Sequence, residues 1–205
     1  MRFRNAYQGI STVFKAEILS LAGTILLAVA AVFAVIGNSG EAAKSGETAT
    51  VIGGAAGLAA LTIIVIALFM QLSGLKRAAK DENAFRTAWF FAIGMLAVDV
   101  LGGLITARGG SSLVSDTSHI FSVFVFIFTV TGISNLANRM NRPDMGALGL
   151  KVLVLQVAMS LVSFILSLFT GSSARPVLSF VSVALDMIVS IVYLVYLSRA
   201  KKMLA

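Results

Sequence analysis

Residues 177–198 read VLSFVSVALDMIVSIVYLVYLS, an apolar stretch with one acidic residue, Asp186, close to its middle. An α-helix needs about 20 such residues to cross the hydrocarbon core of a bilayer. A charged side chain at the centre of a membrane helix costs about 2.5–3.5 kcal/mol on insertion scales. The stretch therefore predicts a transmembrane helix in which Asp186 has either a structural partner or a functional role.

The composition of the whole chain matches this first stretch. Of the 205 residues, 58% are hydrophobic and 12% are charged, whereas soluble domains average about 45–50% apolar and about 25% charged residues. Six apolar stretches are long enough to span a membrane, at about 16–37, 51–73, 88–107, 115–137, 150–170 and 176–197. The sequence thus predicts an all-α integral membrane protein with six transmembrane helices, in which residues 1–205 form one membrane domain.

The distribution of basic residues predicts the orientation of the helices. Thirteen of the sixteen Lys and Arg residues fall before the first span or in the regions that follow the even-numbered spans. They are Arg2, Arg4, Lys15, Lys76, Arg77, Lys80, Arg86, Arg139, Arg142, Lys151, Arg199, Lys201 and Lys202. The positive-inside rule places both termini in the cytoplasm, and the short loops are typical of a bacterial plasma membrane protein. The net charge of +7 is explained by these regions and does not indicate nucleic-acid binding.

Residues 1–15 are predicted to form an interfacial amphipathic helix. Phe3, Tyr7, Ile10 and Phe14 recur at helical spacing, with the basic residues off that stripe. The aromatic residues Trp89, Tyr193 and Tyr196 are expected near the inner membrane interface, as in the aromatic belts of membrane proteins.

A repeat interval of 61 residues relates the ends of the even-numbered spans. The segments SGLKRAAK, SNLANRMN and VYLSRAKK begin at residues 73, 134 and 195, which places Leu75, Leu136 and Leu197 in register. The repeated unit is a helical hairpin, so we expect three hairpins in an up-down bundle. Gly53 and Gly57 in the second span, and Ala30 and Ala34 in the first, form small-residue faces that predict close packing of these two helices.

The last two spans carry matching polar stripes. Gln156, Ser160, Ser163 and Ser167 share one face of the fifth span, and Ser179, Ser182, Asp186 and Ser190 share one face of the sixth. The short loop GSSARP makes the two spans antiparallel neighbours, which places Ser160 and Asp186 at equal depth. We therefore expect a polar seam in which Asp186 exchanges a hydrogen bond with Ser160.

The third span carries a second acidic residue, Asp99, at a depth similar to that of Asp186. Two alternatives remain open at this point. If the helices bring the two carboxyl groups together, they form a coupled pair of the kind that relays protons or cations. Otherwise each acid is neutral and hydrogen-bonded within its own helix pair.

No motif in the sequence indicates an enzyme, a cofactor site or a metal site. Cysteine is absent, which excludes thiolate nucleophiles and cysteine ligands. His119 is the single histidine, and one histidine does not make a metal site.

Two function classes fit the chain. The first is a small-solute or ion transport component that uses the midplane carboxylates. The alternative is a non-catalytic scaffold, accessory or regulatory subunit that contacts partners through the basic cytoplasmic loops. The expected partners are the lipid bilayer and either another membrane protein or a second copy of the chain.

Overall fold

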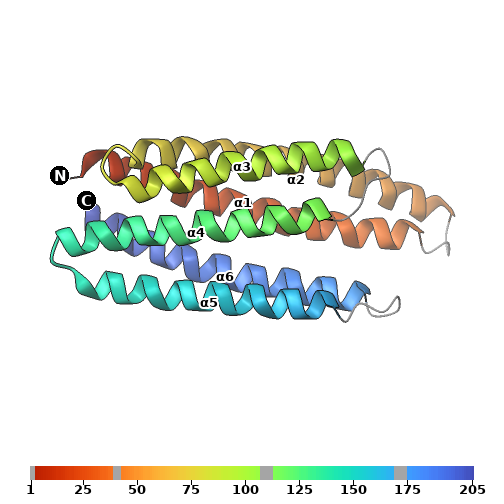
Figure 1. The fold of residues 1–205 in the computed structure, drawn as a ribbon. Coiled ribbons are helices and arrows are strands. Elements are labelled where there is room, and N and C mark those ends of the chain that lie inside the picture. The colour runs from red at the N-terminus through yellow and green to blue at the C-terminus, as the bar shows by residue number, and fades with distance from the viewer. Residues whose placement is uncertain (1–2, 39–42, 107–112, 169–174) are drawn as a thin grey trace. The chain divides into compact units, whose positions relative to one another are not determined.

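The computed structural model describes residues 3–38, 43–106, 113–168 and 175–205, and these residues form six helices (Figure 1). The helices are α1 (Arg4–Asn38), α2 (Ala43–Ala78), α3 (Asn83–Thr106), α4 (Leu113–Arg139), α5 (Pro143–Leu168) and α6 (Arg175–Leu204). Each is long and apolar enough to cross a membrane. The all-helical fold and the six predicted apolar helices are therefore confirmed. Residues 107, 169 and 170 of the predicted spans lie outside the described residues.

The chain divides into two compact units that share α1 and α2. Unit 1 consists of Met1–Ser11 and Leu72–Ala205, and unit 2 consists of Thr12–Gln71. Helix α1 runs without a break from Arg4, so the predicted interfacial segment and the predicted first span belong to one helix. Ala6 and Ile10 are fully buried in the first turns of this helix, while Phe3, Tyr7 and Phe14 are only half-buried.

In unit 1, helix α3 packs against α4, α4 against α5, and α5 against α6 (Figure 1). Aromatic rings join α3 to α4, because Phe91 stacks on Phe124 and Phe128 with ring centroids 4.9 and 5.5 Å away. Phe126 of α4 meets Tyr193 of α6 at 4.6 Å. Helices in lipid gain no hydrophobic stabilisation from contacting each other, so such close side-chain packing is what holds them together.

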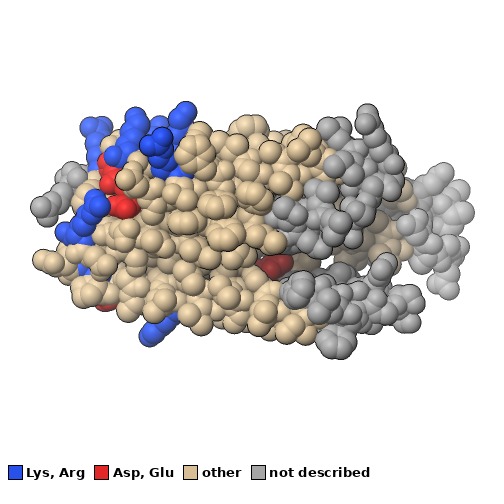
Figure 2. Space-filling view, in the orientation of Figure 1, with Lys and Arg blue, Asp and Glu red and all other residues tan. Residues whose placement is uncertain are grey.

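The three leucines of the 61-residue interval occupy equivalent buried positions. Leu75, Leu136 and Leu197 each have 0% of their surface exposed. They lie at one end of unit 1, where α2, α4 and α6 end and where α3 and α5 begin. We call this end the basic end, because it carries the exposed side chains Arg4, Lys76, Arg77, Lys80, Arg86, Arg139, Arg142, Lys151, Arg199 and Lys202 (Figure 2).

The two tyrosines of α6 that were predicted for the aromatic belt are buried between helices, and their depth in the membrane stays a prediction. Tyr193 and Tyr196 are 5% and 0% exposed. The hydroxyl group of Tyr196 points to the carbonyl oxygen of Val130 on α4, at 3.5 Å. These rings lie among α4, α5 and α6 because their large apolar surface fills the core and the hydroxyl group has an acceptor there. Trp89, the third predicted member, is half-buried.

The turn between α4 and α5 is determined by local sequence. Asn141 adopts a left-handed conformation with φ of 56°, which asparagine tolerates better than most residues. The amide of Arg142 donates to the carbonyl oxygen of Ala137, and the amide of Asn141 donates to that of Asn138. This pair of bonds is the Schellman arrangement that ends helices, and Pro143 then begins α5 with its ring-fixed φ.

In unit 2, the small residues predicted to bring α1 and α2 together do so. A Cβ atom on Gly53 would lie 3.2 Å from the carbonyl oxygen of Ala30 and 3.4 Å from the amide nitrogen of Ala34. One on Gly57 would lie 4.0 Å from the Cβ of Ala30. The predicted close approach of the two helices at these positions is confirmed.

Gly9 is the glycine whose substitution should cost most. A Cβ atom at this position would lie 2.5 Å from the carbonyl oxygen of Gly74 and 2.7 Å from the amide nitrogen of Ala78. Backbone atoms cannot move aside cheaply, so we expect Gly9→Ala to destabilise the protein by about 1–3 kcal/mol, the usual cost of overpacking. The melting temperature in lipid nanodiscs measures this.

Gly54→Ala is the matched control. A Cβ atom at Gly54 meets nothing within 4 Å, and alanine favours a helix over glycine by up to about 1 kcal/mol. We expect this variant to melt at or above the temperature of the parent. Equal melting temperatures for Gly9→Ala and the parent would contradict the close approach at Gly9.

Candidate functional site

Two polar features are candidates for function: an acidic turn at the basic end, and the acidic residues further along α3 and α6. The first was not predicted from the sequence. Asp81 and Glu82 lie in the turn between α2 and α3, and the amides of both donate to the carbonyl oxygen of Ala78. The chain therefore leaves α2 with two adjacent carboxylates fixed on one tight turn.

Asp81 binds the beginning of α1. Its Oδ2 atom accepts a hydrogen bond from the backbone amide of Ala6 at 2.7 Å, and its Oδ1 atom accepts one from the side-chain amide of Asn5 at 2.9 Å. The first amides of a helix have no partner within the helix, and its positive end favours a carboxylate. Asp81 thus caps α1 from 75 residues away in the sequence.

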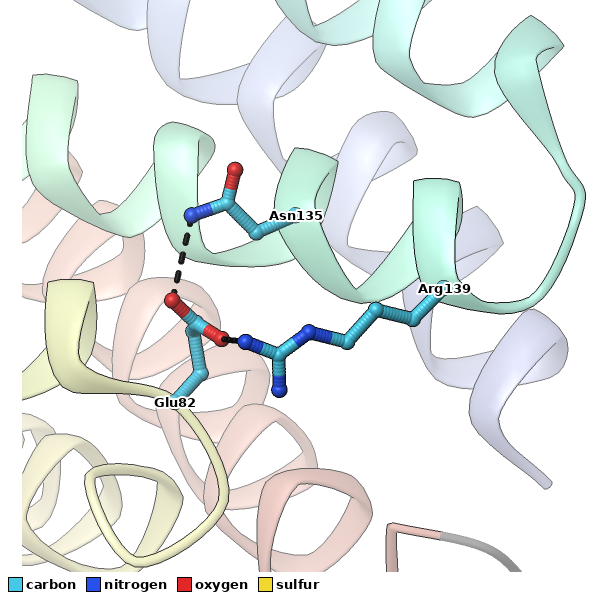
Figure 3. A network of polar contacts seen from close by, with 3 residues as sticks. All are labelled: Glu82, Asn135 and Arg139. Carbon is cyan, nitrogen blue, oxygen red and sulfur yellow. Dashed lines mark hydrogen bonds and ion pairs between the residues drawn. The ribbon is translucent and has the colours of Figure 1, made fainter.

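Glu82 binds the end of α4 (Figure 3). Its Oε1 atom accepts a hydrogen bond from the side-chain amide of Asn135 at 3.1 Å. Its Oε2 atom forms an ion pair with Nη2 of Arg139 at 2.8 Å, without the alignment of a hydrogen bond. The side chain of Glu82 is 7% exposed and that of Arg139 is 57% exposed. Arg139, the last residue of α4, therefore neutralises a buried carboxylate while its outer part remains accessible.

We call Asp81, Glu82 and the side chains of Asn5, Asn135 and Arg139 the acidic clasp. It joins the beginning of α1 and the end of α4 to the turn between α2 and α3, all at the basic end. One signal in the sequence could have revealed it, because residues 81 and 82 are the only two adjacent acidic residues in the chain. They also lie in a region that is otherwise basic.

The second feature begins with Asp186 in α6. Asp186 lies eleven residues before Leu197, which is about three helical turns. It therefore shares the face of α6 that carries the buried residues Val189, Tyr193, Leu197 and Ala200. The exposed apolar residues of α6 lie on the opposite face: Val181, Ile188, Ile191 and Val195. Asp186 is nevertheless exposed, unlike the buried residues of the same face nearer the basic end.

Asp99 in α3 repeats this pattern. It lies eleven residues after the fully buried Ala88, again about three turns. Its face also carries the buried residues Phe85 and Ala92. Four exposed apolar residues of α3 lie opposite, Phe90, Ile93, Ala97 and Leu101, while the exposed Val100 lies beside Asp99. Asp99 is also exposed, and both acids lie about 16 Å along their helices from buried residues at the basic end.

The remaining residues of the predicted polar seam are only partly described. Gln156 and Ser160 of α5 are half-buried, and the side-chain amide of Gln156 donates to the hydroxyl of Ser160 at 3.4 Å. Ser190 is half-buried, and the side chains of Ser163 and Ser182 lie outside the described residues. Helices α5 and α6 pack together, but the hydrogen bond between Ser160 and Asp186 stays a prediction.

The chemistry available at Asp99 and Asp186 is that of carboxyl groups in an apolar zone. Such groups bind cations or exchange protons, and an acid within a membrane span is by default a candidate functional residue. Among the described residues, no group of three or more His, Asp or Glu side chains is placed to hold a metal ion. Figure 2 shows acidic atoms recessed in the apolar surface, away from the basic end.

No protein-family model matches the chain, and neither a curated protein nor a solved structure matches it.

The acidic clasp makes a direct prediction about stability. Removing the charge of Arg139 leaves the buried carboxylate of Glu82 without its cation, which is costly for a buried group. We expect Arg139→Gln to lower the free energy of unfolding by about 1–3 kcal/mol, below the cost of a fully buried pair because Arg139 is half exposed. Thermal unfolding in nanodiscs measures the change.

Arg142→Gln serves as the control for charge at the same end of the protein. Arg142 is exposed and forms no ion pair with an acidic side chain of the described residues, so its substitution should leave the melting temperature unchanged. A similar loss of stability in both variants would show that total charge, and not the pair with Glu82, is responsible.

Proposed function

We propose that the chain is a small-solute or ion transport component of a membrane, in which Asp99 and Asp186 are the groups that meet the transported species. Gln156, Ser160, Ser163, Ser182 and Ser190 supply further polar contacts from α5 and α6. The proposal includes no catalytic, cofactor or metal role, because it uses the carboxylates for binding or proton exchange alone.

One observation carries the proposal: both midplane acids are exposed, and both lie opposite the exposed apolar face of their helix. A carboxylate that served only to pack two helices would be covered by its partner helix. A carboxylate on the apolar face would meet lipid, at a cost of about 2.5–3.5 kcal/mol near the bilayer centre. An exposed acid on the face opposite the apolar face of its helix avoids both conditions.

The proposed topology has three helical hairpins, both termini in the cytoplasm and the basic end on the cytoplasmic side of a bacterial plasma membrane. In unit 1, the beginning of α1 and the end of α6 both belong to the basic end, which supports an even number of crossings. The positive-inside rule then assigns that end to the cytoplasm.

Proteoliposomes test the transport role. We expect vesicles that contain the protein to dissipate an imposed proton gradient, measured with an entrapped pH-sensitive dye, or an imposed monovalent-cation gradient, measured with an entrapped cation-sensitive dye. Asp99→Asn and Asp186→Asn should each reduce the flux to that of protein-free vesicles, since asparagine retains the shape of aspartate but cannot bind a proton or a cation in the same way. Melting temperatures at or above that of the parent would show that both variants are folded.

Asp144→Asn is the matched control, because Asp144 is an exposed acid in the first turn of α5 at the basic end. This variant should transport like the parent. Flux that is equal in the parent, the two midplane variants and empty vesicles would overturn the transport proposal for protons and monovalent cations.

The alternative function, a non-catalytic membrane scaffold or regulatory subunit, has its own supporting observation. The basic end presents many exposed cationic side chains, and the clasp holds the helix ends that carry several of them together. A membrane protein that copurifies in fixed stoichiometry, and no longer does so when Arg199 and Lys202 are changed to Gln, would favour this alternative.

A further inference from the structure

A cluster of cationic and aromatic side chains lies where α2 ends and α3 begins. The Nζ atom of Lys76 lies 5.8 Å from the ring centroid of Trp89, and the Cζ atom of Arg86 lies 5.9 Å from that of Phe90. The two rings meet edge to face at 5.2 Å. Each cation is thus within the range of a cation–π interaction. We call Lys76, Arg86, Trp89 and Phe90 the aromatic–basic cluster.

The nearby acidic residues do not neutralise this cluster. Asp81 and Glu82, the two acids of the connecting turn, bind Asn5 and Ala6 of α1 and Asn135 and Arg139 of α4. Lys76 and Arg86 are exposed, as are their neighbours Arg77 and Lys80. Within the described parts of the chain, none of these four cations is paired with an acidic side chain. The cluster therefore presents a net positive charge beside aromatic rings.

An exposed apolar strip begins at the cluster and runs along α3. Arg86, Phe90, Ile93, Ala97 and Leu101 follow one another at spacings of three or four residues, which places them on one face of the helix. Phe90, Ile93 and Leu101 are 56%, 38% and 57% exposed. The surface therefore combines a cationic head with an apolar track of several helical turns, the same division that a phospholipid has between its headgroup and its acyl chains.

We propose that the aromatic–basic cluster and this strip bind an anionic phospholipid, with the headgroup phosphate at Lys76 and Arg86 and an acyl chain along Phe90, Ile93 and Leu101. Lysine and arginine are the usual ligands of phosphate groups, and cations near an anionic leaflet attract its headgroups. The apolar strip favours a lipid over a free phosphate ion, because a soluble anion gains nothing from it. The aromatic rings hold the two cations at the depth where headgroups lie. This site does not depend on the proposed transport role.

The chain offers a direct probe of this site, because Trp89 is its single tryptophan. Bromine atoms on an acyl chain quench tryptophan fluorescence only at short range. We therefore propose to reconstitute the full chain in phosphatidylcholine vesicles that contain small fractions of brominated phosphatidylglycerol or of brominated phosphatidylcholine. Each cation near an anionic surface favours an anionic over a neutral lipid by about five-fold in binding. We therefore expect brominated phosphatidylglycerol to be enriched beside Trp89 at least about five-fold over brominated phosphatidylcholine. Equal quenching by the two lipids would overturn the proposal.

Variants separate a specific site from the general charge of the basic end. The double variant Lys76→Gln/Arg86→Gln should lose most of the preference, and Lys76→Arg should retain it. The control Arg199→Gln/Lys202→Gln removes two exposed cations of α6 from the same end, and it should quench like the parent. Loss of the preference in this control as well would show a diffuse surface effect and overturn the assignment to the cluster.

A competition experiment distinguishes the two sources of phosphate. Added inorganic phosphate or glycerol phosphate, at an ionic strength matched with chloride, should leave the preference for phosphatidylglycerol unchanged. If either soluble anion abolishes the preference, the cluster binds free phosphate and the lipid assignment is wrong. The preference of the unmodified parent for phosphatidylglycerol over phosphatidylcholine is measured first. This measurement needs no variant, so it tests the proposal even if a variant does not fold.

Discussion

The organisation of the basic end depends on one polar interaction, that of the buried carboxylate of Glu82 with its two partners on α4. A carboxylate that is 7% exposed must be matched by donors, because a buried charge without partners is too costly for a folded protein to retain. Asn135 and Arg139 supply the match from one face of α4, one helical turn apart. Asp81, the preceding residue, is held equally firmly by the first turn of α1. Two adjacent residues therefore determine where the beginning of α1 and the end of α4 lie relative to the turn between α2 and α3.

This arrangement concentrates tight packing at one end of unit 1. Phe85, Ile133, Leu136, Tyr196 and Leu197 are fully buried there, close to the polar groups that fix the helix ends. Further along α3 and α6, the faces that are buried near the basic end carry Asp99 and Asp186, and both are exposed. The difference is physically reasonable, because helices in lipid associate through close side-chain contacts and through polar ties. Where such ties hold the helix ends, the side chains of these faces are buried, and about three turns further along Asp99 and Asp186 are exposed.

The sequence predicted some contacts correctly because they depend on residue size and helical period alone. Gly53 and Gly57 could be paired with Ala30 and Ala34 because small residues at an interval of four share one helix face. The burial of Leu75, Leu136 and Leu197 agrees with their common place in a 61-residue interval. The two tyrosines of α6 were expected near the inner interface, and helical spacing alone did not show that they are buried between helices. The clasp was missed because its partners lie 53–76 residues apart, a separation over which no local pattern operates.

Composition and the length of the apolar stretches were enough to establish that this protein is all-helical and that six of its segments are long and apolar enough to cross a membrane. They were enough because the backbone in lipid must satisfy its own hydrogen bonds, which leaves a continuous apolar stretch of about 20 residues little choice but a helix. The sequence also located Asp99 and Asp186 as the acids that need an explanation. The packing of the helices was needed to show which helix faces are buried, that both acids lie on those faces and yet are exposed, and that Asp81 and Glu82 bind two distant helix ends. Burial and pairing of this kind depend on which helices become neighbours, and helical periodicity identifies the faces of a helix without naming the neighbour that each face meets.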